Sequence, residues 1–376
     1  MDKRTVFCVV PAAALMAALF CVGGRAMAQG GPAKSPPVLY AAGYERNSGG
    51  NYVVMVWKID GSTVTPIALT DGTRGGQASG ITAGGGSIYA AGYERHGKFV
   101  ARVWKIDGSV VTPIALTDGT RHARAQAIAA GGGSIYVAGY EENSGGKDIA
   151  MVWRIDGSTV TPMTLTGGTQ NANAWGIAAS GGSIYVAGYE VNSGGKGAAM
   201  VWKVDGSRVT PMALTDGTQY GWAEGIAASG GSLYAAGYEE NSGGKFVAKV
   251  WKIDGSRRTS IALTGGTRHA RAQAITAGGG SLYAAGYEVN SGGKFVARVW
   301  KIDGSRVTPM ALTDGTRYAV SWGIAASGGS LYAAGWEGED EGFAKVWKID
   351  GSTVIPMTLT GGTDWSRAYA VIEVNE

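Results

Sequence analysis

The fold of this chain is decided by residues 176–215, which read GIAASGGSIYVAGYEVNSGGKGAAMVWKVDGSRVTPMALT. The first half holds two runs rich in Ile, Val, Ala and Tyr, joined by Ser180-Gly181-Gly182, a composition typical of a tight hairpin turn. A loop with Asn192-Ser193-Gly194-Gly195 leads to a third apolar run, and Asp205-Gly206 reverses the chain into a fourth. The stretch therefore predicts four consecutive antiparallel strands.

Copies of this stretch recur along the chain, and each is marked by a Val-Trp pair at a spacing of 47 or 49 residues. The seven tryptophans are Trp57, Trp104, Trp153, Trp202, Trp251, Trp300 and Trp347. Four strands in a repeat of this length, without helical periodicity, favour the blade of a β-propeller over the coil of a solenoid. We expect the repeated Trp and Tyr side chains to fill the space between blades.

The two ends of the repeat region complement each other. The first copy begins at its second strand, residues 38–44, and the last copy is followed by a lone first strand, residues 369–374. Together they make one blade, and pairing them would close a ring and remove exposed strand edges. The sequence therefore predicts an all-β fold: a seven-bladed β-propeller of four-stranded antiparallel blades, closed by pairing the C-terminal strand with the N-terminal three strands.

Runs such as Ile135–Tyr140 followed by Met151–Asp156 resemble those of secreted bacterial β-propeller repeat proteins, and the resemblance covers residues 38–376. The repeat length is close to that of kelch repeats, but Ala-Gly-Tyr stands where a kelch repeat has its double glycine. Each scaffold Trp is followed by Lys or Arg rather than by the Asp of a WD repeat, and the sialidase Asp-box is missing. The resemblance implies the architecture and leaves the activity open, because propellers serve as lectins, scaffolds and enzymes.

The N-terminal segment differs from the repeats. Lys3 and Arg4 precede an apolar run over residues 6–22, and Ala26-Met27-Ala28 offers the small residues of a cleavage site. We predict a signal peptide over residues 1–28, cleaved after Ala28, a Gly/Pro linker over residues 29–37 and the propeller over residues 38–376. This organisation predicts a secreted or periplasmic protein with no membrane span in its mature chain, and we expect a monomer.

Composition narrows the chemistry further. Cys8 and Cys21 both lie in the predicted signal peptide, so the mature chain has no disulfide and no Cys-based metal site. Residues 29–376 carry 30 Lys and Arg against 28 Asp and Glu, a net charge of about +2, which gives no electrostatic basis for binding nucleic acid. With only three histidines, the sequence predicts neither a Ser/His/Asp triad nor a His-rich metal site, and no cofactor.

The copies differ mainly in the crossing that follows the Gly-Thr of strand four and leads to the next copy. The second, fourth and sixth residues of the crossing vary, whereas those between them stay mostly Ala or Gly. The small residues suit the narrow space near the axis, and a period of two places the variable side chains on the opposite side. The 21 variable places hold four Trp, three Tyr, three Arg and two His.

Free drift of exposed loops would favour Ser, Asn, Lys, Gly and Asp, whereas Trp, Tyr, Arg and His are typical of binding hot spots. The loop between strands two and three also varies on this face, while the turns on the other face hardly change. We therefore predict a ligand-binding face. Its candidate residues are His122, Arg124, Trp175, Tyr220, Trp222, Glu224, His269, Arg271, Tyr318, Trp322, Trp365, Arg367 and Tyr369.

Three functions fit these patterns. The leading hypothesis is an extracytoplasmic binding module that presents the aromatic and Arg-rich face to an extracellular glycan or protein, in one composite site near the axis. The second is an extracytoplasmic enzyme at the channel mouth, with Glu224 and an Arg or His neighbour as acid and base. Glycoside hydrolysis uses paired carboxylates, and Glu224 is alone among the variable places, so a binding role is favoured over catalysis. The third is a purely structural surface repeat.

Overall fold

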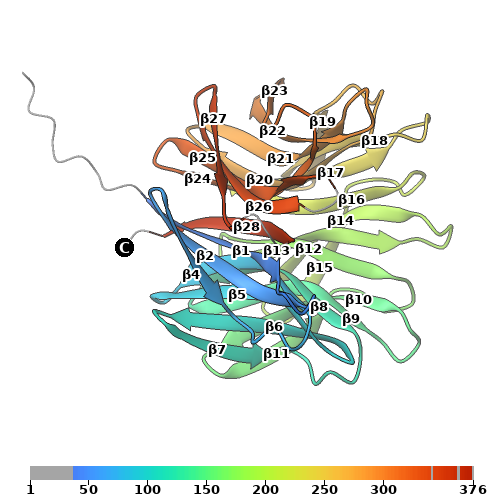
Figure 1. Cartoon of the computed structure of the whole chain (residues 1–376). Helices are drawn as coiled ribbons and strands as arrows, with labels where there is room; N and C mark the ends of the chain where they lie inside the picture. The colour runs from blue at the N-terminus through green and yellow to red at the C-terminus, as the bar shows by residue number, and fades with distance from the viewer. Residues whose placement is uncertain (1–36, 340–341, 362–364, 375–376) are drawn as a thin grey trace, which may run out of the picture. The chain divides into compact units, whose positions relative to one another are not determined.

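The computed structural model describes residues 37–339, 342–361 and 365–374, so the predicted signal peptide and most of the linker lie outside the described residues. Within these ranges every regular element is a β-strand, and the 28 strands form seven four-stranded antiparallel sheets (Figure 1). The predicted all-β class and the seven blades are confirmed. Blade 1 joins β28 to β1, β2 and β3, and blades 2 to 7 follow in chain order from β4.

Each blade runs from an inner strand beside the axis to an outer edge strand. The inner strands are β4 (Gly76–Gly84), β8 (Ala123–Gly131), β12 (Ala172–Ser180), β16 (Gly221–Ser229), β20 (Ala270–Gly278), β24 (Tyr318–Ser327) and β28 (Ser366–Val374). The second strands are β5 (Ser87–His96), β9 (Ser134–Glu142), β13 (Ser183–Val191), β17 (Ser232–Glu240), β21 (Ser281–Val289), β25 (Ser330–Gly338) and β1 (Val38–Arg46).

The other two strands of each blade lie farther from the axis. The third strands are β6 (Lys98–Asp107), β10 (Asp148–Asp156), β14 (Gly197–Asp205), β18 (Phe246–Asp254), β22 (Phe295–Asp303), β26 (Gly342–Asp350) and β2 (Tyr52–Asp60). The outer strands are β7 (Val110–Ala115), β11 (Thr159–Thr164), β15 (Arg208–Ala213), β19 (Arg257–Ala262), β23 (Arg306–Ala311), β27 (Thr353–Thr358) and β3 (Thr63–Ala68).

The ring is closed by its two ends. β28 pairs antiparallel with β1, so that Tyr40 lies opposite Ile372 and Leu39 opposite Glu373. The inner strand β28 also contacts its neighbours β24 and β4, as the other inner strands contact theirs. The predicted pairing of the terminal strands is therefore confirmed, and it covers the edge that β1 would otherwise leave unpaired.

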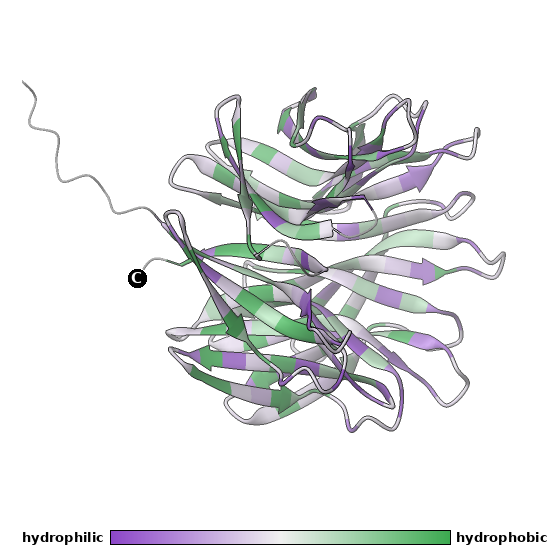
Figure 2. Ribbon diagram, in the orientation of Figure 1, coloured by the Kyte–Doolittle hydropathy of each residue, from purple (hydrophilic) through white to green (hydrophobic). Residues whose placement is uncertain are grey.

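The space between blades is filled by the repeated Trp of the third strand. All seven are at most 3% exposed. Trp202 of blade 4, for example, shares a cluster with Ala150 and Val152 of blade 3. Apolar positions lie within the strands and hydrophilic ones lie mainly toward the loops, as expected for wedges packed face to face (Figure 2). The predicted packing role of these tryptophans is confirmed.

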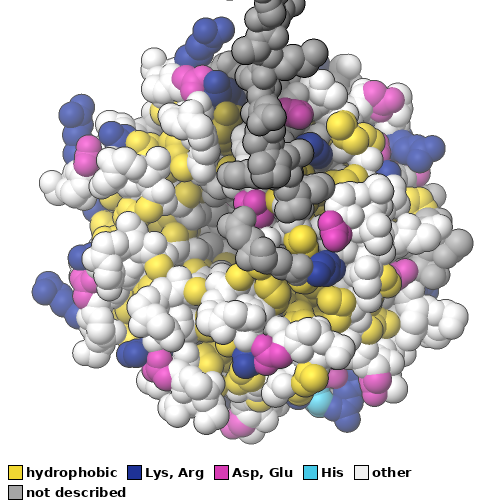
Figure 3. All heavy atoms as spheres, turned by 90° about the vertical axis from the view of Figure 1, so that its left-hand side faces the viewer, with side chains coloured by type: hydrophobic (Ala, Val, Ile, Leu, Met, Phe, Trp, Pro, Cys, Tyr) yellow, Lys and Arg dark blue, Asp and Glu magenta, His cyan; other side chains and the backbone are white. Residues whose placement is uncertain are grey.

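One face of the ring carries the tight turns, and we call it the turn face. Gly181 and Gly182 adopt φ of 58° and 79° in the turn between the first two strands, a conformation that favours glycine. Nearby, Ser183 Oγ donates to Asp205, and Lys203 Nζ lies 2.8 Å from the same carboxylate. Figure 3 views this face and shows basic and acidic side chains around its outer part. We call the opposite face, with the crossings and the loops between strands two and three, the loop face.

Candidate functional site

The sixth residue of each crossing lies at the propeller axis. In blade 4 the ladder between β12 and β13 pairs Ala174 with Gly188 and Gly176 with Ala187, so it skips Trp175. All seven blades have the same β-bulge at this position. A bulge re-aims a side chain. The seven side chains concerned line the cavity at the axis: Ser79, Gln126, Trp175, Glu224, Gln273, Trp322 and Tyr369.

The bulge also explains a glycine in the second strand of every copy. A Cβ on Gly188 would overlap the carbonyl oxygen of Asn173, and the equivalent glycine of every other blade meets the same conflict. The pairing register is therefore irregular at the sixth residue, because an extra residue enters the strand there. Glycine inside a strand is a known sign of a bulge, so the sequence did carry this signal.

The small residues of the crossing lie where the blades approach most closely. A Cβ on Gly176 would lie 3.0 Å from the Cα of Gly225 in the next blade, and one on Gly225 would lie 2.9 Å from the Cα of Ala274. This confirms the predicted role of the small residues near the axis. The inner strands therefore form a tight collar, and the bulged side chains line its opening.

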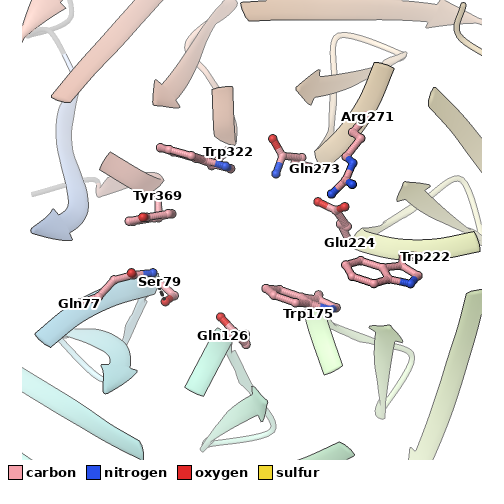
Figure 4. Close-up of a pocket in the computed structure, with 10 residues that line it drawn as sticks. All are labelled: Gln77, Ser79, Gln126, Trp175, Trp222, Glu224, Arg271, Gln273, Trp322 and Tyr369. Atoms are coloured by element: carbon pink, nitrogen blue, oxygen red, sulfur yellow. Dashed lines mark hydrogen bonds between the residues drawn. The ribbon is translucent and has the colours of Figure 1, made fainter. Parts of the chain in front are cut away.

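We call the cavity on the loop-face side of this collar the axial pocket. It has a volume of about 290 Å³ and combines aromatic with polar side chains (Figure 4). Its lining residues are Gln77, Ser79, Gln126, Trp175, Trp222, Glu224, Arg271, Gln273, Trp322 and Tyr369. All ten occupy the fourth or sixth position of a crossing.

Two aromatic walls face each other across the axial pocket (Figure 4). On one side the rings of Trp322 and Tyr369 are stacked, with centroids 4.6 Å apart and planes inclined by 26°. On the other side Trp175 and Trp222 are stacked at 6.4 Å and 16°. One wall comes from β24 of blade 7 and β28 of blade 1, and the other comes from β12 of blade 4 and β16 of blade 5. Strands that are far apart in sequence are opposed in space because the ring is closed.

Polar side chains fill the two gaps between the walls. In one gap Gln77 Nε2 donates to Ser79 Oγ at 3.0 Å, and Gln126 lies beside this pair (Figure 4). The other gap holds a carboxyl, a guanidinium and an amide, from Glu224, Arg271 and Gln273. A ligand between the aromatic walls would therefore meet hydrogen-bonding groups along both edges.

Glu224 is the carboxyl that lines the axial pocket, and its surroundings alter its ionisation. Burial raises the pKa of Glu224 to about 7, although the positive charge of Arg271 and a hydrogen bond from Gln273 act to lower it. Near neutral pH its carboxyl is therefore divided between an acid that donates a hydrogen bond and a carboxylate that accepts.

Two residues of the axial pocket are held by aromatic rings of the preceding blade. The Arg271 guanidinium carbon lies 4.3 Å from the ring centroid of Tyr238 and 4.8 Å from that of Phe246. The indole of Trp222 stacks on Tyr189 at 4.5 Å, with planes 9° apart. Such cation–π and stacking contacts fix both side chains before any ligand arrives, which lowers the entropy cost of binding.

Three buried polar atoms of these residues have no hydrogen-bond partner in the described part of the chain: Trp175 Nε1, Arg271 Nε and Gln273 Oε1. Buried polar atoms are nearly always paired in proteins, either with protein groups or with water. Because these three residues line the axial pocket, a water or a ligand group there would complete the pairing.

The remaining predicted residues lie outside the axial pocket. His122 Nδ1 accepts from the backbone N–H of Phe99, and His269 Nδ1 accepts from that of Phe246, both at 3.2 Å. The guanidinium of Arg124 lies over the Phe99 ring at 4.1 Å. These three side chains therefore tie one blade to the next, a structural role that the sequence alone did not indicate.

The other four predicted residues also contact neighbouring side chains at the loop face. Lys196 Nζ lies 4.8 Å from the ring centroid of Tyr220, and Lys294 Nζ lies 5.1 Å from that of Tyr318. Arg367 lies over Trp336 at 5.0 Å, with Trp365 at 6.0 Å.

Six of the thirteen predicted residues thus meet in the axial pocket, namely Trp175, Trp222, Glu224, Arg271, Trp322 and Tyr369. Sequence reasoning left out four polar members, Gln77, Ser79, Gln126 and Gln273, although all occupy the same variable positions.

Within residues 37–339, 342–361 and 365–374, no three His, Cys, Asp or Glu side chains gather closely enough to hold a metal ion. The same part of the chain contains no helix with the length and apolarity needed to cross a membrane.

Seven blades closed around a cavity at the axis define a seven-bladed β-propeller. No protein-family model matches the sequence, and no curated protein matches it either. Solved structures share the fold. One is the β-propeller domain of the Trilobed protease from Pyrococcus furiosus, which has an open velcro topology; the TM-score is 0.54 at 12% identity, covering 88% of this chain and 97% of that one.

Two further solved structures are similar at the level of fold. A puromycin-hydrolyzing peptidase from Mycobacterium tuberculosis matches with a TM-score of 0.60 at 13% identity, over 87% of this chain and 52% of that one. A putative 6-phosphogluconolactonase from Bacteroides uniformis matches with a TM-score of 0.55 at 14% identity, over 90% of this chain and 99% of that one. At these identities the likeness supports the propeller architecture alone. The narrower resemblance to secreted bacterial repeat proteins stays a prediction.

Proposed function

We propose that this protein is an extracytoplasmic binding module that takes one sugar ring of a glycan into the axial pocket. The observation that carries the proposal is the pair of opposed aromatic walls, Trp322 with Tyr369 and Trp175 with Trp222. A pyranose ring has two apolar faces that pack on aromatic rings and an equatorial edge of hydroxyl groups that need hydrogen-bond partners. Walls on two sides and polar groups in the gaps between them match that distribution.

The size of the axial pocket limits the ligand. Its volume of about 290 Å³ lies at the lower end of the range for small-molecule sites, about 300 to 1,000 Å³. One ring fits such a space, and the rest of a glycan chain would extend over the loop face. Because the lining residues differ from blade to blade, the propeller offers one composite site rather than seven equivalent ones.

The polar groups would give the directional contacts. The amides of Gln126 and Gln273 both donate and accept, and Glu224 can do either near neutral pH because its pKa is raised to about 7. Arg271, fixed on Tyr238, would donate to a hydroxyl or carbonyl oxygen. These groups suit a neutral sugar with several hydroxyls better than a strongly charged ligand.

A glycan array followed by titration calorimetry tests the proposal on the purified mature chain. Trp175→Ala and Trp322→Ala each remove one of the two rings of an aromatic wall and should weaken binding at least about tenfold, because each deletes a large part of the ligand contact on that side. Trp365→Ala is the matched control, since Trp365 is a variable Trp of the loop face that does not line the axial pocket. Equal losses in all three variants, or unchanged binding in the first two, would contradict a sugar site between the walls.

Catalysis is the second candidate, and the raised pKa of Glu224 is the observation that favours it, because a carboxyl with a pKa of about 7 can act as a general acid or base. Glu224 is the single carboxyl that lines the axial pocket, so a paired-carboxylate glycosidase does not fit. A turnover screen with glycans and lactones tests this candidate. Product formation that Glu224→Gln abolishes would support an enzyme, and no turnover of any substrate would retire it.

A further inference from the structure

The outer strands show a regular pattern that one blade breaks. In six of the seven outer strands the fourth residue is proline: Pro66, Pro113, Pro162, Pro211, Pro309 and Pro356. In β19 of blade 5 the fourth residue is Ser260. Proline on an edge strand prevents another strand from pairing with it, so its loss at a single blade changes what that edge can do.

The hydrogen-bond register shows which way the backbone of Ser260 points. Leu263 N donates to Ala248 O at 2.8 Å, so those two residues form a hydrogen-bonded pair. Pairs alternate along an antiparallel ladder, and Ser260 opposite Trp251 is therefore a non-hydrogen-bonded pair. The N–H and C=O of Ser260 point away from the blade. The prolines of the other blades occupy the same register, where they offer no N–H.

A second change in the same strand adds charge. The second residue of the other six outer strands is a valine that packs against a core cluster: Val64, Val111, Val160, Val209, Val307 or Val354. In β19 it is Arg258, which is exposed and follows the exposed Arg257. Neither arginine has an ion-pair partner among the described residues. Successive side chains of a strand point to opposite faces, so the two charges flank the open edge.

We propose that β19 is a docking edge for an extended acidic segment of a partner protein, which adds a fifth strand to blade 5. The outward backbone groups of Arg258, Ser260 and Ala262 provide the ladder, and Arg257 and Arg258 select for carboxylates on either face of the added strand. A second copy of this chain is a poor occupant, because pairing two β19 edges would bring like charges together.

The test uses the full mature chain and a fluorescein-labelled peptide of alternating Thr and Val that ends in two Glu, with a peptide ending in two Lys as its charge control. Fluorescence anisotropy should detect the acidic peptide and not the basic one. Ser260→Pro should weaken binding at least about tenfold, since it removes the central N–H of the ladder and covers the edge. The variant should fold, because six blades already carry proline there.

A reciprocal variant tests the proposal by a gain of peptide binding instead of a loss. Val307→Arg combined with Pro309→Ser gives β23 of blade 6 the pattern of β19, since Arg306 already precedes Val307. This double variant should bind two peptides per chain instead of one. Hydrogen exchange should slow at Arg258 and Ser260 in the wild-type chain when the acidic peptide is bound.

Three results would overturn the proposal. The first is no binding of the acidic peptide by the wild-type chain. The second is equal binding by Ser260→Pro. The third is a concentration-dependent dimer of the wild-type chain that Ser260→Pro abolishes, which would make a second copy the occupant of the edge.

Discussion

The turn face and the axial pocket are built from the same seven repeats and follow opposite rules. On the turn face the same trio recurs: a Ser hydroxyl and a basic side chain meet one Asp, as at Ser183, Lys203 and Asp205 in blade 4. Equivalent trios stand at Ser87, Lys105 and Asp107, at Ser134, Arg154 and Asp156, and at Ser281, Lys301 and Asp303. At the axial pocket the equivalent position holds five residue types across the seven blades, and all seven side chains line a common cavity.

The electrostatics of the two regions differ in the same way. Hydrogen bonds from Lys203 and Ser183 hold the pKa of Asp205 below its ordinary value. Burial at the axis instead raises the pKa of Glu224. Hydrogen-bond partners stabilise the charged form of a carboxyl, whereas the loss of hydrating water without full compensation favours its neutral form. The difference teaches that the aspartates of these turn-face trios are paired within the protein, whereas the carboxyl at the axis is not fully compensated.

The largest expected effect separates scaffold tryptophans from pocket tryptophans. Trp202→Ala removes a fully buried indole between blades 3 and 4 and should lower the free energy of unfolding by about 3 to 5 kcal/mol. Trp175→Ala removes an indole that borders an open cavity and should cost clearly less. Urea denaturation followed by circular dichroism measures both. A loss at Trp175 as large as that at Trp202 would mean that the axial tryptophans are scaffold as well.

The next effect concerns the pH dependence of stability. The folded-state pKa of Glu224 is about 7, above its unfolded value of 4.5, so the folded state binds more protons between these pH values and loses stability as the pH rises through them. Glu224→Gln removes the ionisation and should be more stable than the wild-type chain at pH 8, by up to about 3 kcal/mol.

At pH 5 Glu224 of the folded chain is neutral and resembles Gln, so the urea midpoints of the two chains should differ much less than at pH 8. Urea midpoints across pH 5 to 8 provide the comparison. The difference in stability between the wild-type chain and Glu224→Gln could instead stay constant over this pH range. That result would show that the axial carboxyl is as well compensated as the carboxyls of the turn face.

The smallest effect is expected on the turn face. Because the folded pKa of Asp205 is lowered, its contribution to stability is present above the unfolded pKa and is lost as the pH falls through the folded pKa. The trio is exposed to solvent, so Asp205→Asn should shift the thermal midpoint only slightly at neutral pH and still less in high salt. A large shift in calorimetry would show that this face does more than satisfy its own polar groups.

Much of the axial pocket followed from repeat comparison. The variable positions of the crossing identified Trp175, Glu224 and Trp322 because an internal alignment of seven copies exposes what differs. The same comparison predicts His122 and Arg124 as site residues, yet they contact the preceding blade at Phe99. Residue type and position cannot separate a side chain that packs against a neighbouring blade from one that meets a cavity, since both are large and both vary.

The sequence by itself determined the number of blades, the strand order within each blade and the closure of the ring, because the repeat period, the turn residues and the complementary ends are local patterns. Only the tertiary structure decided which variable residues share one pocket. That outcome depends on a β-bulge at Trp175 and its counterparts, which turns one side chain per blade toward the axis, and on ring closure, which opposes strands distant in sequence. Burial and proximity, which set the pKa of Glu224, exist only after the seven inner strands have come together.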